Sequence, residues 1–153
     1  MTLDEAMTGF LQQGLPMHLG TRDDQLEPNG ARAVALKVED DRQHIVVFVP
    51  SRSAPRVLRD LESNGQGAVA VARPLDDKAA QIKGVFVESW PATDAERPLV
   101  DAQFRACNAQ LEMIGIPLIA TVNWASWPCV AIRLKVNALF DQTPGPKAGA
   151  EVA

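Results

Sequence analysis

The sequence predicts a mainly β fold of one domain, in which an antiparallel sheet curls into a barrel and two or three helices pack outside it. Segments with a strand pattern outnumber segments with a helical pattern by two to one. Most neighbouring segments are joined by connections too short for a parallel crossover. The chain has 153 residues, of which 46% are hydrophobic, so it is long enough to bury one core.

Three segments have the periodicity of an amphipathic helix. Residues 3–14 place leucine, methionine and phenylalanine side chains on one face and end at a glycine. Residues 53–65 carry a proline in the first turn and an Asn-Gly stop. Residues 94–115 repeat apolar side chains at steps of three to five before a glycine and a proline end the helix.

Six segments are predicted as strands, namely residues 17–21, 31–41, 44–50, 68–73, 81–90 and 129–140. Within residues 31–41, Val34, Leu36 and Val38 alternate with other side chains, which is the period of a strand with one buried face. The acidic turn at residues 40–43 joins this segment to the next one as a hairpin. We expect residues 1–143 to form the domain. Residues 144–153 are rich in Pro, Gly and Ala and form either a mobile tail or an extended arm.

Charge and composition narrow the possible partners and location. The net charge is −4, and acids and bases are interspersed, so we expect neither nucleic acid nor a membrane as a partner. No apolar run approaches the roughly 20 residues of a membrane span, and the N-terminus carries acids where a secretory signal carries bases. We therefore expect a cytoplasmic protein. Cys107 and Cys129 lack metal-ligand spacing, so reduced, buried thiols and no metal site are expected.

The stretch FVPSRSAP, residues 48–55, places an arginine and two hydroxyls between a strand and a helix. Free backbone N–H groups and the helix dipole at a helix N-terminus attract an anion. Ser51 and Ser53 can donate hydrogen bonds, and the planar fork of Arg52 fits phosphate oxygens. The alternative is that Ser53 caps the helix while Arg52 is a solvated surface charge.

Arg32 and Lys37 lie at opposite ends of an apolar strand. Because they are five residues apart, they point to opposite faces of an ideal strand. Both can serve one ligand only if a bulge, a strand end or a symmetry-related subunit intervenes.

Taken together, these segments resemble the flavin-binding split-barrel family that includes pyridoxamine 5′-phosphate oxidase and related flavin reductases. The resemblance covers roughly residues 15–140. It rests on three motifs in order: an R-x4-K strand (Arg32, Lys37), an S-R-x-A helix start (Ser51, Arg52, Ala54) and a Q-x-K-G strand (Gln81, Lys83, Gly84). It implies a six-stranded antiparallel split β-barrel.

The resemblance also implies a cofactor site, in which FMN lies at a homodimer interface. The two basic residues of the first strand and the S-R turn would hold the phosphate. Gln81 would contact the flavin ring and, with Lys83, tune it, while Val49 would offer backbone contacts. Trp124 or Trp127 of the partner either borders the flavin or, as an alternative, packs a core edge or subunit interface. The full candidate set is Arg32, Lys37, Val49, Ser51, Arg52, Ser53, Gln81, Lys83, Trp124 and Trp127.

The resemblance implies an FMN-dependent oxidoreductase that moves a hydride or electrons between flavin and an unknown small substrate, with NAD(P)H as one possible donor. No catalytic side chain is predicted. The family's vitamin-B6 oxidases carry an R-x-H pair near the C-terminus, whereas this chain has Arg133 and Lys135. Oxidation of pyridoxamine phosphate is therefore not expected. The alternative is a non-catalytic module on the same barrel that holds a flavin, a deazaflavin or haem.

Overall fold

A computed structural model describes residues 1–152 of the chain. In this part of the chain the strands are β1 (Met17–Arg22), β2 (Pro28–Ala33), β3 (Ala35–Val38), β4 (His44–Pro50), β5 (Gln66–Ala72), β6 (Ala79–Pro91), β7 (Cys129–Asp141) and β8 (Ala150–Glu151). The helices are α1 (Glu5–Leu11), α2 (Ala54–Asn64) and α3 (Arg97–Met113), with a short 3-10 helix at Leu118–Ala120. None of these helices is long and apolar enough to cross a membrane.

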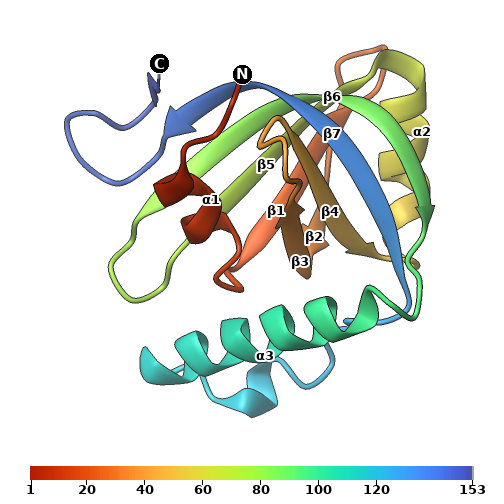
Figure 1. Cartoon of the computed structure of the whole chain (residues 1–153). Helices are drawn as coiled ribbons and strands as arrows, with labels where there is room; N and C mark the ends of the chain where they lie inside the picture. Colours follow the sequence, from red (N-terminus) through yellow and green to blue (C-terminus); the bar gives the residue numbers. More distant parts are fainter. Residues whose placement is uncertain (153) are drawn as a thin grey trace.

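The strands form one antiparallel sheet in the order β2-β1-β5-β6-β7-β4-β3, which curls round on itself (Figure 1). The two end strands, β2 and β3, follow each other in the chain with only Val34 between them. β2 pairs with β1, and β3 pairs with β4. The bend at Val34 therefore joins the two ends of the sheet and closes the barrel.

The predicted barrel with packed helices is confirmed, although eight strands replace the predicted six. The segment predicted as one strand at residues 31–41 contributes to both β2 and β3, because the chain changes partner strand at Val34. The eighth strand lies in the C-terminal tail, where Glu151 pairs with Phe140 of β7. Residues 150–151 of the tail thus dock on the sheet, and bends and turns precede them.

The barrel interior is filled by apolar side chains from every wall, including Leu19, Leu36 and Ile132. α1 contributes Leu11 to this core, and α2 contributes Leu61. Each of these five side chains is at most 1% exposed. Each Å² of apolar surface that is removed from water contributes about 25 cal/mol to the stability of the fold. This interior therefore stabilises the closed sheet.

A second apolar cluster lies outside the barrel, between the sheet and α3. It joins Val34, Phe48 and Ala131 of the sheet to Val100 of α3. Figure 1 shows α3 below the curled sheet, apart from α1 and α2. The outer face of β3, β4 and β7 is therefore covered where this cluster lies.

The free edge of β3 is satisfied by a side chain of α3. Gln103, which is 7% exposed, accepts a hydrogen bond from the Leu36 backbone N–H at 2.9 Å and donates one to the Leu36 carbonyl at 2.8 Å. Gln12 accepts a further bond from the Val38 N–H at 2.9 Å. These amides take the place of a neighbouring strand, so this edge is not open for pairing.

Candidate functional site

A small pocket of about 100 Å³ lies where β4 runs into α2. Its walls come from the turn at Arg52 and Ser53, from Arg32 of β2, and from a loop that includes Asn123 and Trp124. Segments far apart in the chain thus meet at the S-R-S turn. Four of the predicted site residues line this pocket, namely Arg32, Arg52, Ser53 and Trp124.

Arg32 is the most constrained cation of the pocket. Its guanidinium carbon lies 4.2 Å from the centre of the Trp124 ring and 5.6 Å from that of Phe104. One of its N–H groups donates to the Ala125 carbonyl at 3.4 Å. The two rings hold the guanidinium in place through cation–π contact.

The charge of Arg32 has no counterion in the described part of the chain, where no carboxylate oxygen lies within 4.0 Å of it. Burial lowers the pKa of this half-buried guanidinium, because a charge removed from water is less stable. An arginine nevertheless stays protonated at neutral pH. A half-buried, uncompensated cation with unused N–H donors is well suited to bind an anion.

The S-R-S turn does not use its serine as a helix cap. Ser53 occupies the N-cap position of α2, but its side chain makes no capping hydrogen bond. The capping alternative is therefore wrong for the Ser53 hydroxyl, which is exposed beside the exposed Arg52.

The helix N-terminus itself offers fewer donors than the sequence suggests. The Ser53 N–H donates to the Pro50 carbonyl at 2.8 Å, and the Ala54 N–H donates to the Ser51 carbonyl at 3.4 Å. Pro55 has no N–H group. Ser51, half-buried, donates its N–H to the Pro128 carbonyl at 2.9 Å. Anion binding at this turn would therefore depend mainly on side chains.

An irregularity at Val34 brings Arg32 and Lys37 to the same side of the barrel wall. Ala33 and Leu36 point into the barrel core, whereas Val34 and the next residue along the chain both join the outer cluster. Two successive outward residues shift the alternation by one, so Arg32 and Lys37 both face outward. Lys37 is exposed and does not line the Arg32 pocket.

Gln81 and Lys83 lie on the outer face of the same sheet but far from the pocket. The cross-strand row runs from Arg32 to His18, Ala70 and Gln81. Three strand spacings separate its ends, which is about 14 Å. Within a single chain, Gln81 and Arg32 are therefore not close together.

The glycine of the Q-x-K-G motif has a packing role. A Cβ atom at Gly84 would lie 2.9 Å from the Lys135 carbonyl oxygen of β7. The register between β6 and β7 also shifts between Lys83 and Gly84. Only a residue without a side chain allows β7 to approach this closely.

Two other predicted residues point elsewhere. Val49 is fully buried in the barrel core, and its backbone is paired with Val130 of β7. Trp127 packs against the outer cluster, and the guanidinium of Arg97 lies 5.4 Å from its ring centre. Trp124 borders the pocket from within the same chain, where a tryptophan of the partner was expected.

Sequence reasoning missed Asn123 as a pocket residue and Phe104 as a support for Arg32. The signal for Asn123 was its place directly before Trp124, a predicted site residue. Phe104 carried no separate signal, because its helical spacing is equally typical of a core residue.

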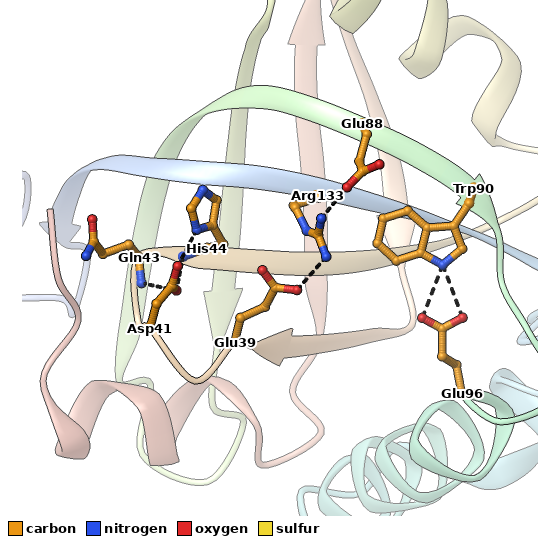
Figure 2. A network of polar contacts seen from close by, with 8 residues as sticks. All are labelled: Glu39, Asp41, Gln43, His44, Glu88, Trp90, Glu96 and Arg133. Atoms are coloured by element: carbon orange, nitrogen blue, oxygen red, sulfur yellow. Dashed lines mark hydrogen bonds and ion pairs between the residues drawn. The ribbon is translucent and has the colours of Figure 1, made fainter.

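A second arginine, Arg133, lies in a polar network on the outer sheet face (Figure 2). It donates to Glu39 at 2.8 Å and also pairs with Glu88. Its guanidinium carbon lies 5.2 Å from the ring centre of Trp90, whose indole N–H donates to Glu96 at 3.2 Å. Because two carboxylates already use Arg133, it is not available to hold a substrate phosphate.

Both cysteines are buried, as the sequence predicts. Burial raises the pKa of Cys107 and that of Cys129, the latter to about 12. The Cys129 thiol also donates to the Ser126 carbonyl at 2.8 Å. These thiols stay protonated at neutral pH and are poor nucleophiles. Among residues 1–152, no group of three or more His, Cys, Asp and Glu side chains is placed to hold a metal ion.

A scan against protein-family models and a search of curated proteins found no match to this sequence. Solved structures do match it. An F420 reductase superimposes with a TM-score of 0.61 at 14% identity, covering 90% of this chain and 98% of that one. A protein of Lactobacillus delbrueckii assigned as a pyridoxamine 5′-phosphate oxidase superimposes with a TM-score of 0.56 at 12% identity, covering 91% and 93%.

An FMN-binding protein of Syntrophomonas wolfei gives a TM-score of 0.52 at 15% identity, covering 89% of this chain and 88% of that one. The chain has the split-barrel fold of the pyridoxamine 5′-phosphate oxidase-like proteins. The sequence resemblance is thereby confirmed at the level of the fold, over nearly the whole chain.

The pocket of this split barrel fits part of the cofactor that the sequence resemblance implies. Arg32, Arg52 and Ser53 together supply two cations and a hydroxyl, which match the oxygens of a phosphate group. The volume of about 100 Å³ suits a phosphate but not a three-ring flavin. A flavin ring would therefore extend outside this pocket.

Proposed function

We infer that this split-barrel chain binds a phosphate-bearing flavin cofactor, namely FMN, and acts as an oxidoreductase. The observation that carries the inference is the uncompensated guanidinium of Arg32, held between aromatic rings beside Arg52 and Ser53. Each charge-assisted hydrogen bond to a phosphate oxygen contributes about 1.5 to 3 kcal/mol. Two arginines thus account for a large part of the affinity for a small phosphate ester.

The flavin ring would lie between two copies of the chain, because one chain separates the residues expected to bind it. Arg32 and Gln81 are at opposite ends of one cross-strand row on an outer face whose middle contains the small residue Ala70. A second copy packed on this face could place its own Gln81 near the first copy's Arg32. The homodimer is supported by this arrangement rather than by an open edge at β3, which Gln103 covers.

The residues of the chain would bind and orient the cofactor rather than react covalently. Arg32 and Arg52 would anchor the phosphate, Trp124 would exclude water from one side, and a donor such as Gln81 would act on the ring. The chemistry supplied by a flavin held there would be the transfer of a hydride, or of two electrons, from a donor such as NAD(P)H to a second small molecule. The neutralised Arg133 supports a substrate other than pyridoxamine phosphate.

A deazaflavin is the second candidate cofactor. The likeness to an F420 reductase, with a TM-score of 0.61, favours it. The pocket residues would hold the phosphate of either cofactor in the same way, because they contact only the phosphate end. A module that holds such a cofactor, or haem, without turnover stays the alternative to the enzyme.

The test is the visible absorption spectrum of the purified protein, followed by a titration with FMN while flavin fluorescence is recorded. We expect saturable FMN binding that weakens about tenfold in Arg52→Ala, since one charged contact with phosphate is lost. Reduction of the bound flavin by NADH or NADPH would then distinguish an enzyme from a binding module. A haem absorption band would instead favour the haem alternative.

The matched control is Arg59→Ala, which removes an exposed arginine of α2, the helix that follows the Arg52 turn, and this arginine does not line the pocket. It should leave the FMN affinity unchanged. Sedimentation of the FMN complex tests the dimer. A failure of FMN to bind would contradict the proposed cofactor, and a monomer that binds FMN fully would contradict the shared flavin site.

A further inference from the structure

A second and larger cleft lies on the outside of the barrel, at the hairpin that joins β1 to β2. Its volume is about 630 Å³, within the range of small-molecule sites. Its lining includes Arg22, Asn29, Gln66 and Lys83, and it shares no residue with the Arg32 pocket. Along β1 the cleft begins two residues beyond His18, the residue paired with Arg32. It is therefore a separate place in the fold.

The two cations of this cleft lack a counterion among the residues that the structure describes. Neither Arg22 nor Lys83 has a carboxylate oxygen within 4.0 Å, although five other arginines of the chain form ion pairs. Arg22 donates only to the Asp23 backbone carbonyl, at 3.1 Å. Lys83 lies 4.7 Å from the ring centre of Phe140. In a chain of net charge −4, two uncompensated cations around one cleft favour an anion.

The floor of the cleft is formed by a strand row of small residues, Gly20 and Ala68. A Cβ atom at Gly20 would meet only the Ala68 carbonyl oxygen, at 3.6 Å, which is ordinary contact. Space for a ligand therefore begins directly above the backbone. Arg22 and Lys83 rise on either side of this floor, with Cα atoms about 12 Å apart by strand geometry.

The wall of the cleft is held in place by one buried and one partly buried hydrogen bond. The Thr21 hydroxyl donates to Asp60 of α2 at 2.7 Å, and the two residues are 8% and 2% exposed. The Asn64 amide donates to the Arg22 carbonyl at 2.7 Å. These contacts tie α2 to β1, so the cleft is formed before any ligand arrives.

The nearby carboxylates are committed to other contacts and do not line the cleft. Asp60 accepts a hydrogen bond from the Thr21 hydroxyl, and Asp24 accepts one from the Ser63 hydroxyl. Asp23 accepts hydrogen bonds from two backbone N–H groups of its own turn. These carboxylates therefore leave Lys83 and the remaining side-chain N–H donors of Arg22 without a carboxylate partner among the described residues.

We propose that this cleft is a binding site for a small organic anion, whose oxyanion groups are held by Arg22 and Lys83 and whose body lies on Gly20 and Ala68. Phosphate and carboxylate share the required chemistry, since both accept charge-assisted hydrogen bonds. The site does not depend on the flavin pocket. A ligand here is recognised even if the chain never binds FMN.

The experiment is a titration of the isotope-labelled full chain with AMP and, separately, with citrate, followed by amide NMR. Binding of either probe should shift the backbone signals of Gly20, Gly67 and Ala68. A response to AMP alone identifies a phosphate ester, and a response to citrate alone identifies a carboxylate. Lys83→Gln and Arg22→Gln should each weaken binding about tenfold.

A steric variant provides an independent test. Gly20→Val fills the floor without backbone strain, because Gly20 lacks a positive φ, and it should abolish probe binding. Ala72→Val, on an exposed site of β5 outside the cleft, and Arg59→Gln are the controls and should leave binding unchanged. The proposal is overturned if neither probe shifts these signals at millimolar concentration, or if binding survives in folded Gly20→Val.

Discussion

Two arginines on the outside of the barrel, Arg32 and Arg133, are each stacked on a tryptophan but differ in their charged neighbours. Arg32 lies 4.2 Å from the ring centre of Trp124 and forms no ion pair in residues 1–152. Arg133 lies 5.2 Å from that of Trp90 and pairs with two glutamates. An arginine beside an aromatic ring is therefore not in itself an anion site. Neighbouring carboxylates determine whether such an arginine can bind an anion, because they neutralise its charge and occupy its N–H donors.

The largest expected effect is a difference in FMN affinity between variants of the two arginines. Arg32→Ala should weaken FMN binding roughly tenfold to hundredfold, since a charged contact with the phosphate is lost. Arg133→Ala should change the affinity by less than about twofold, because its guanidinium is already neutralised. Fluorescence titration of both variants measures the difference. Equal losses in the two variants would refute the contrast.

For folding stability we expect the opposite order, in which replacing Arg133 has a larger effect than replacing Arg32. Arg133→Met leaves Glu39 and Glu88 without their shared cation, and the free energy of unfolding should fall by about 1 kcal/mol. Arg32→Met removes an uncompensated charge and keeps the apolar contact with Trp124, so it should unfold no more easily than the parent. Urea unfolding of the cofactor-free proteins gives both values. A larger loss in Arg32→Met would show that the pocket arginine stabilises the fold.

The difference in anion binding between Arg32 and Arg133 should become smaller when the carboxylates paired with Arg133 are removed. Glu39→Gln combined with Glu88→Gln removes both carboxylates while keeping similar side-chain shapes. The freed guanidinium should then bind inorganic phosphate up to about fivefold more tightly than the parent protein does at this face. Quenching of Trp90 fluorescence by phosphate follows this site. Unchanged quenching would mean that pocket shape, rather than charge, distinguishes the two arginines.

The smallest expected effect concerns Asp41, which forms a separate group with Gln43 and His44 beside the Arg133 network (Figure 2). Hydrogen bonds from the Gln43 backbone N–H and from the His44 ring lower the pKa of Asp41 from its usual 3.8 to about 2. Because the pKa is lower in the folded chain, this carboxyl stabilises the fold above pH 3.8. The contribution is lost as the pH falls toward 2.

Asp41→Asn should therefore reduce the dependence of the melting temperature on pH between about 4 and 2, with little change at neutral pH. Thermal unfolding at a series of pH values measures this slope. Asp40→Asn, a change at an exposed neighbour, is the control and should leave the slope as it is in the parent. An unaltered slope in Asp41→Asn would show that these hydrogen bonds do not stabilise the folded chain.

Much of the fold could be predicted because strand and helix periods are local properties of the chain. The alternating apolar residues at 31–41 and the apolar run at 44–50 predict a hairpin, and the antiparallel pairing of β3 with β4 confirms it. Glycine at position 65, with a φ of 72°, ends α2 as the Asn-Gly stop predicts. The split at Val34 was not predicted, since a change of partner strand depends on how the sheet closes.

The candidate site could be predicted only in part. The residue types of the S-R-S turn are visible in the sequence, and so is its place between a strand and a helix. Whether Ser53 caps the helix depends on the rotation of one side chain. Whether Gln81 meets Arg32 depends on the number of strands between them, which no local pattern contains.

The sequence by itself determined the barrel, its helices and the chemical groups at the turn, because hydrophobic periodicity and helix stop signals act over a few residues. Only the tertiary structure decided which charges remain uncompensated. Glu39 reaches Arg133 from the turn after β3 and Glu88 reaches it from β6, whereas the loop that carries Trp124 brings a ring and a carbonyl to Arg32 but no carboxylate. Coulomb interactions between charges act over a few ångströms in space, so their partners are set by the folded sheet and not by spacing along the chain.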